Sequence, residues 1–146
     1  MEVIDDTVSL PSTIDKVLFC TGKIYYNLIE EKEKLNSENI AVVRVEQLYP
    51  FPQKQLFDIK AKYFNAKHWL WVQEEPENMG AWGFMRRMTK DIPLKLCAAR
   101  PASGSPATGS SKLHKLQQQR ILDKAFGKCT CEWALSECDM FCVKGE

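Results

Sequence analysis

The feature that most constrains the fold of this chain is a regular alternation of short apolar segments with longer amphipathic ones. The short segments are rich in β-branched and aromatic residues and end at glycine, proline or polar residues, as strands buried on both faces do. The longer segments carry apolar side chains at helical spacing. Strands are predicted over residues 16–22, 40–45, 68–72 and 94–98, and helices over 24–35, 53–64, 78–89 and 112–126.

This order of elements, β-α-β-α-β-α-β-α, predicts the fold class. Parallel neighbours need a crossover connection, and right-handed crossover helices cover both faces of the sheet. We therefore predict an α/β fold, a three-layer αβα sandwich around a mostly parallel sheet. The 146 residues suit one domain. We place it at 16–127, ending at the typical helix-stop residue Gly127, after a lead-in at 1–15 and before a disordered tail at 128–146.

Charge and hydropathy exclude several classes of partner. The 20 Lys and Arg nearly balance the 19 Asp and Glu, whereas a nucleic-acid-binding protein would show a basic excess or patch. No apolar run reaches the roughly 18 residues of a membrane span. The first ten residues lack the basic and apolar regions of a secretory signal. We expect no nucleic-acid partner, no membrane span, a reducing compartment, and, from the abrupt start, a fragment of a longer chain.

Polar residues follow the predicted strands, at the edge where open α/β sheets usually bind ligands. A Pro/Gly/Ser-rich loop at 100–111 precedes the last helix, and a helix N-terminus offers free N–H donors to an anion. The alternative is a simple connecting loop capped by serine. No GxxxxGK[ST] or GxGxxG motif is present. The candidate anion or regulatory site consists of Lys23, Lys54, Arg100, Ser103, Ser105, Ser110, Ser111 and Lys112.

The segment after the third predicted strand carries a second group of candidates. Glu74 and Glu75 are adjacent, so in an extended chain they point to opposite sides and do not form an acid/base pair. One carboxylate could lie in an interface, and the alternative is a helix cap or a salt bridge. The candidate interface residues are Gln73, Glu74, Glu75, Asn78 and Trp82. Neither histidine belongs to a recognisable catalytic pattern, so we assign no catalytic residue.

Six cysteines divide into two groups. Cys20 and Cys97 lie in apolar runs and are expected to be small buried side chains. The other four crowd into the tail, where they could supply thiolates to zinc or an iron–sulfur cluster, but their spacing departs from the usual paired CxxC units. A disordered extension is the favoured interpretation. These weak metal-ligand candidates are Cys129, Cys131, Cys138 and Cys142.

Three long motifs resemble one known family. They are RVEQLYPFP at 44–52, WVQEEPENMGAW at 71–82 and RPASGSPATGSSKLH at 100–114, and LFCTGKIYYNL at 18–28 is similar as well. They occur in the same order and context in the thiamine-diphosphate-dependent decarboxylating first component of 2-oxoglutarate dehydrogenase. The match is to its C-terminal, transketolase-C-like domain and covers residues 3–127. The Cys-rich tail departs from the family pattern.

The resemblance implies a role within a larger enzyme. Members of the family decarboxylate 2-oxoglutarate in the tricarboxylic acid cycle and transfer a succinyl group to the lipoyl group of a dihydrolipoyl succinyltransferase. Their thiamine diphosphate and magnesium are held by other domains of a homodimer. The implied role of this fragment is therefore structural and dimer-forming, with no cofactor bound and no activity alone. The implied location is cytoplasmic in a bacterium and the mitochondrial matrix in a eukaryote.

Alternatives remain open at this stage. Relatives that act on 2-oxoadipate share the motifs, so the motifs do not fix which 2-oxoacid the parent enzyme uses. One rival function is a stand-alone regulatory module that binds an anionic nucleotide or acyl-CoA at the Arg100 loop. The other is a metal-binding adaptor that acts through the cysteine tail.

Overall fold

The structure, a computed structural model, describes residues 3–6, 10–94, 96–100 and 111–127. Its centre is a five-stranded sheet in the order β1-β3-β2-β4-β5, in which β2 to β5 are parallel and β1 is antiparallel to β3. The strands are β1 (Val3–Ile4), β2 (Lys16–Cys20), β3 (Ile40–Val45), β4 (His68–Pro76) and β5 (Leu96–Arg100). The helices are α1 (Ile24–Leu35), α2 (Gln53–Lys62), α3 (Trp82–Met88) and α4 (Ser111–Ala125), with a 3₁₀ turn, η1, at Pro11–Thr13.

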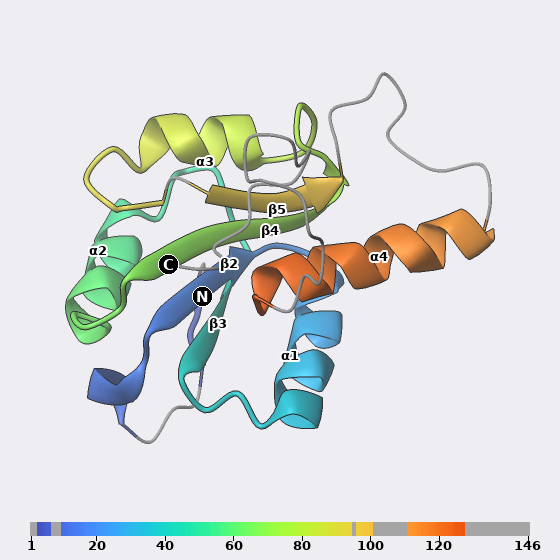
Figure 1. Cartoon of the computed structure of the whole chain (residues 1–146). Coiled ribbons are helices and arrows are strands. Elements are labelled where there is room, and N and C mark those ends of the chain that lie inside the picture. The colour runs from blue at the N-terminus through green and yellow to red at the C-terminus, as the bar shows by residue number, and fades with distance from the viewer. Residues whose placement is uncertain (1–2, 7–9, 95, 101–110, 128–146) are drawn as a thin grey trace.

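The helices form the two outer layers of the predicted sandwich. Figure 1 shows α2 and α3 on one side of the sheet and α1 and α4 on the other. Two apolar clusters match these layers, one between the sheet and α2 and α3, the other between the sheet and α1 and α4. The predicted α/β class and mostly parallel sheet are confirmed. Among the described residues, no helix has the length and apolar character needed to cross a membrane.

Strand alternation assigns side chains to the two clusters. Trp69 and Trp71 lie in the cluster that faces α2 and α3, and the ring of Phe19 stacks on Trp69 with 5.9 Å between centroids. Leu70 and Val72, which alternate with these tryptophans along β4, lie in the cluster that faces α1 and α4. Burial of both faces explains why these strands are continuously apolar rather than alternating.

Several element boundaries differ from the sequence prediction. The third helix begins at Trp82 rather than 78, because Gly80 takes a positive φ of 68° that an α-helix does not allow. Strand β4 continues through Pro76, four residues beyond the predicted end, and β5 begins two residues later than predicted. The predicted lead-in at 1–15 is not only a linker, since it contains β1 and the buried side chain of Ile14.

The last helix ends as the sequence predicts. Gly127 has a φ of 71°, and its N–H donates to the carbonyl of Lys124 over 3.2 Å. The ammonium group of buried Lys16 donates to the carbonyl of Ala125 over 3.1 Å, so it satisfies an otherwise free carbonyl at the negative end of the helix dipole. Burial lowers the pKa of Lys16 below its ordinary value.

Two adjacent aspartates fasten β1 to both outer layers. Asp6 forms an ion pair with Lys32 of α1 at 2.6 Å and accepts the backbone N–H of Val42 over 2.9 Å. Asp5 pairs with Lys62 of α2 and accepts the hydroxyl of Tyr63 over 2.7 Å. The two carboxylates therefore hold the edge strand on opposite sides, and burial, together with the hydrogen bond to Asp5, raises the pKa of Tyr63.

The substitution Asp6→Ala tests this attachment. It removes the partner of Lys32 and leaves the Val42 N–H at the sheet edge without an acceptor, so the free energy of unfolding should fall by about 1–3 kcal/mol. Urea denaturation measures the change. The exposed Asp58 of α2 provides the matched control, and Asp58→Ala should change stability by less than about 0.5 kcal/mol. Equal losses in both variants would contradict the assignment.

The buried thiols generate a prediction about alkaline pH. Cys20 and Cys97 are buried and free, as predicted, and burial raises the pKa of each to about 12 from an ordinary 9.0. Between these two pKa values the unfolded chain loses thiol protons that the folded chain keeps. The contribution of the buried thiols to stability is therefore fully present below pH 9.0 and is lost as the pH rises toward their folded pKa. Lys16 acts in the opposite direction, because its folded pKa is lowered.

We expect the free energy of unfolding to decrease from about pH 8.5 to about pH 10.5 in urea titrations. The double variant Cys20→Ala, Cys97→Ala should show a smaller decrease, because both raised pKa values are removed while the tail cysteines are kept. An unchanged pH slope in the double variant would show that these thiols do not contribute.

Candidate functional site at the carboxyl ends of the strands

The parallel strands β2 to β5 end at one edge of the sheet, where α/β proteins usually place their ligands. The motif at 71–82 spans the end of β4, the connection that follows it and the first residue of α3, and it belongs to this edge. It is organised by a single side chain, Gln73, which is only 2% exposed.

Gln73 uses both ends of its amide. Its Oε1 atom accepts the indole N–H of Trp71 over 2.8 Å and the backbone N–H of Trp82 over 3.1 Å. Its Nε2 atom donates to the carbonyls of Pro76 over 2.8 Å and Met79 over 2.7 Å. The side chain of Gln73 therefore fixes the conformation of the β4–α3 connection. It also fixes the first residue of α3, a helix whose N-cap residue makes no side-chain hydrogen bond.

Gly80 allows this closure. A Cβ atom at this position would lie 3.1 Å from Oε1 of Gln73 and 3.2 Å from the Cβ atom of Glu75, and the positive φ of Gly80 disfavours other residues as well. The close approach of the backbone to Gln73 explains why a glycine interrupts an otherwise helical pattern.

The predicted interface residues divide into buried and accessible ones. Gln73 and Trp82, which is 5% exposed, are side chains that this chain itself covers. Glu74 and Glu75 diverge as predicted: Oε1 of Glu74 accepts Gln118 of α4 over 3.3 Å, whereas Glu75 lies beside Gly80. Neither glutamate takes part in the ion pairs between described residues. Glu75 and Asn78 are exposed.

The predicted anion-binding residues are distributed over several elements. Arg100 ends β5, and its Nε atom donates to the backbone carbonyl of Glu74 over 2.9 Å. Exposed Lys23 and Lys54 stand at the starts of α1 and α2, which cover opposite faces of the sheet. Ser111 and Lys112 are the exposed first residues of α4. The other predicted members, Ser103, Ser105 and Ser110, lie outside the described residues, as do the tail cysteines Cys129, Cys131, Cys138 and Cys142.

An aromatic and charged cluster at this edge was missed by the sequence analysis. The guanidinium of Arg44 lies over the rings of Tyr25 and Tyr26, at 5.3 and 5.4 Å from their centroids, and pairs with Glu46 at 2.7 Å. Nearby along the chain, Tyr49 is 87% exposed. The available signal was an arginine inside the otherwise apolar strand IAVVRV, because a charge at the end of a buried strand needs partners at the surface.

The described residues contain no group of three or more His, Cys, Asp or Glu side chains that could hold a metal ion. His68 opens β4, at the amino edge of the sheet and away from the polar segments. The described part of the carboxyl edge thus offers hydrogen-bonded structure and exposed aromatic and charged side chains, but no metal-ligand cluster.

The substitution Gln73→Leu tests the network in the β4–α3 connection. Two N–H donors and three carbonyls, those of Glu75, Pro76 and Met79, lose a partner, so the free energy of unfolding should fall by about 2–4 kcal/mol. Urea denaturation followed by tryptophan fluorescence measures it, since Trp71 and Trp82 contact the altered position. The control Gln53→Leu changes an exposed glutamine and should have little effect. A loss below about 1 kcal/mol would contradict the role of Gln73.

Comparison with known proteins identifies the family. Residues 1–126 match the family described as 2-oxoglutarate dehydrogenase C-terminal. The chain is 42% identical over 124 residues to the 2-oxoglutarate dehydrogenase E1 component of Azotobacter vinelandii. This match covers 80% of the chain but only 13% of that relative. On this evidence, the chain belongs to the family of 2-oxoglutarate dehydrogenase C-terminal domains.

Proposed function

We propose that this chain serves as the C-terminal domain of an E1 component that decarboxylates 2-oxoglutarate. The observation that carries the proposal is the family match over residues 1–126, which includes the segment that Gln73 organises. In the parent enzyme, the reaction is oxidative decarboxylation on thiamine diphosphate with magnesium, followed by succinyl transfer to the lipoyl group of a dihydrolipoyl succinyltransferase. The enzyme would act as a homodimer in the tricarboxylic acid cycle, in the cytoplasm of a bacterium or the mitochondrial matrix of a eukaryote.

The described residues do not fit a complete site for the cofactor. Magnesium on a diphosphate needs a set of oxygen ligands, and this part of the chain holds no cluster of three or more metal-ligating side chains. We therefore assign no step of the decarboxylation to residues of this chain. The proposed contribution is structural: the domain supports the fold and the dimer on which a site elsewhere in the parent enzyme depends.

The exposed residues of the carboxyl edge support a contact role. Tyr26 is 63% exposed and lies beside Arg44, and Tyr49 is more exposed still. Tyrosine and arginine are enriched at protein interfaces, because they combine a large contact area with polar groups. Together with Glu75 and Asn78, these residues are our candidates for contact with the remainder of the parent enzyme.

A chimeric enzyme tests the proposed function. The matching region of the Azotobacter vinelandii E1 component is replaced by residues 1–127 of this chain, and 2-oxoglutarate decarboxylation is measured with thiamine diphosphate and magnesium. We expect activity within about tenfold of the parent, because a domain of the same fold should restore the same contacts.

The control is the same enzyme with the region deleted, which should be inactive. The chain alone should give no turnover. A chimera that is folded and dimeric by circular dichroism and size-exclusion chromatography, yet no more active than the deletion control, would contradict the proposal.

A further inference from the structure

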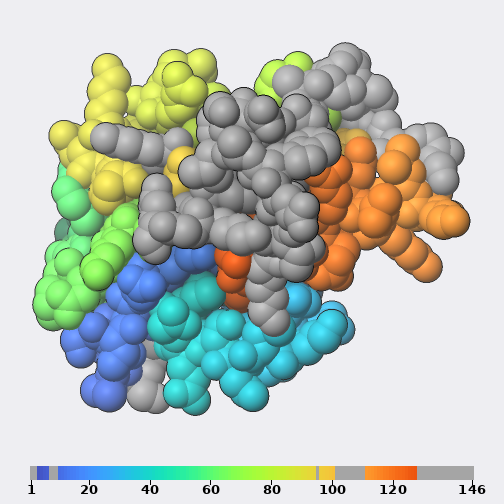
Figure 2. All heavy atoms as spheres, in the orientation of Figure 1, coloured from blue at the N-terminus to red at the C-terminus, as the bar shows by residue number. Residues whose placement is uncertain are grey.

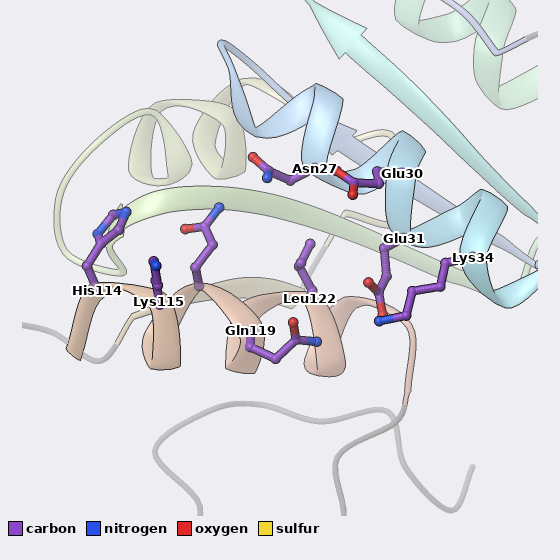
Figure 3. Close-up of a pocket in the computed structure, with 9 residues that line it drawn as sticks. Asn27, Glu30, Glu31, Lys34, His114, Lys115, Gln119 and Leu122 are labelled. Atoms are coloured by element: carbon purple, nitrogen blue, oxygen red, sulfur yellow. The ribbon is translucent and has the colours of Figure 1, made fainter. Parts of the chain in front are cut away.

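A groove separates α1 and α4 on the outer surface of the domain. It has a volume of about 330 Å³, at the lower end of the range for small-molecule sites. In Figure 2, α4 extends past α1 at the edge of the molecule. Figure 3 shows Glu31 pointing from α1 toward α4, and Leu122 pointing back from α4. The groove is therefore built by two helices, with polar side chains on both walls and one apolar side chain between them.

Glu31 is the residue that distinguishes this groove. It is 8% exposed, yet it takes part in none of the hydrogen bonds or ion pairs of the described residues. Neither carboxylate oxygen of Glu31 is fully buried, and the residue lines the groove, so these oxygens face the groove. The side chain is thus mostly covered by protein, while its carboxylate oxygens stay open to the groove with no hydrogen-bond donor of the described residues on them.

The neighbouring amides of α4, Gln118 and Gln119, each direct one N–H elsewhere and keep a side-chain oxygen as an acceptor. Nε2 of Gln118 is directed to Glu74 over 3.3 Å, and Nε2 of Gln119 is directed to Asp123 over 2.9 Å. An amide whose NH₂ group is engaged elsewhere presents its carbonyl oxygen to other partners. In Figure 3 the oxygen of Gln119 is turned toward α1. The groove thus offers a carboxylate and amide oxygens as acceptors.

The cations around the groove do not satisfy Glu31. Lys34, His114 and Lys115 line the groove and are exposed, and none of them is paired with a carboxylate of the described chain. Glu30, also on the groove wall, adds a second exposed carboxylate. The deep carboxylate therefore remains open to a donor from outside.

We propose that this groove binds a guanidinium or primary ammonium group, with Glu31 as its carboxylate partner. A guanidinium suits it best, because its planar fork donates to a carboxylate through two N–H groups and leaves further donors for the amide oxygens of Gln118 and Gln119. The aliphatic part of such a ligand would pack on Leu122. A free guanidino compound and the arginine side chain of a peptide both present this chemistry.

Titration of the ¹⁵N-labelled chain with methylguanidinium at constant ionic strength tests the proposal. We expect saturable chemical-shift changes at the backbone amides of α1 and α4 that line the groove. Tetramethylammonium carries the same charge but no N–H donor, and it should give none. No saturable change up to about 50 mM, or equal changes with tetramethylammonium, would overturn the proposal.

Two glutamine substitutions on α1 provide the matched test. Glu31→Gln should weaken methylguanidinium binding at least about tenfold, because it removes the charge-assisted pair and keeps the side-chain shape. Glu33→Gln makes the same change of charge at an exposed position of α1 outside the groove and should leave binding unchanged. Equal weakening in both variants would overturn the proposal, since it would reduce the effect to net charge.

The same titration separates the two sources of the ligand. The second ligand is the peptide acetyl-Gly-Arg-Gly-amide. If its affinity is at least about tenfold higher than that of methylguanidinium, the site is assigned to an arginine of a protein segment. Equal affinities would assign it to a free guanidino compound. Binding of both ligands should depend on Glu31, and neither titration depends on the activity of the parent enzyme.

Discussion

Burial of both faces of the sheet is the constraint on which the rest of this structure depends. Strands β2, β3 and β4 carry apolar side chains toward both helical layers, so polar groups are confined to the strand ends, the sheet edge and the outer helices. The edge strand β1 follows the same rule, because Asp5 and Asp6 reach outward to lysines of α2 and α1. These polar side chains thus lie where the apolar layers between the sheet and the helices end.

Where a polar side chain does enter the interior, it organises the chain around it. Gln73 is compatible with burial because Trp71 and Trp82 donate to its oxygen and two carbonyls accept its NH₂ group. That arrangement closes the β4–α3 connection and favours glycine at position 80, where a Cβ atom would lie 3.1 Å from the amide oxygen of Gln73. Gln73 and Gly80 together therefore fix the conformation between β4 and α3.

Local patterns predict the regular elements well, and tertiary contacts explain the differences. The sequence predicts α1 and β3 to the residue, because helical spacing and a β-branched run are local signals. It misses β1, which has only two residues and exists through its pairing with Val45 and Arg44. It assigns Gln73 to an interface because adjacent polar residues look exposed, and only the fold shows that the strand continues and turns Gln73 inward.

Gln73 and Glu31 show how burial separates a structural polar residue from a binding one. Both are more than nine-tenths buried, and local sequence indicates the burial of neither, since Gln73 precedes two glutamates and Glu31 lies in the charged run IEEKEK. Gln73 has its donors and acceptors supplied within the chain, so its burial is explained by folding alone. Glu31 has none among the described residues and faces an open groove. The folded domain accounts for the first side chain completely, whereas the second keeps its carboxylate open to a donor from outside.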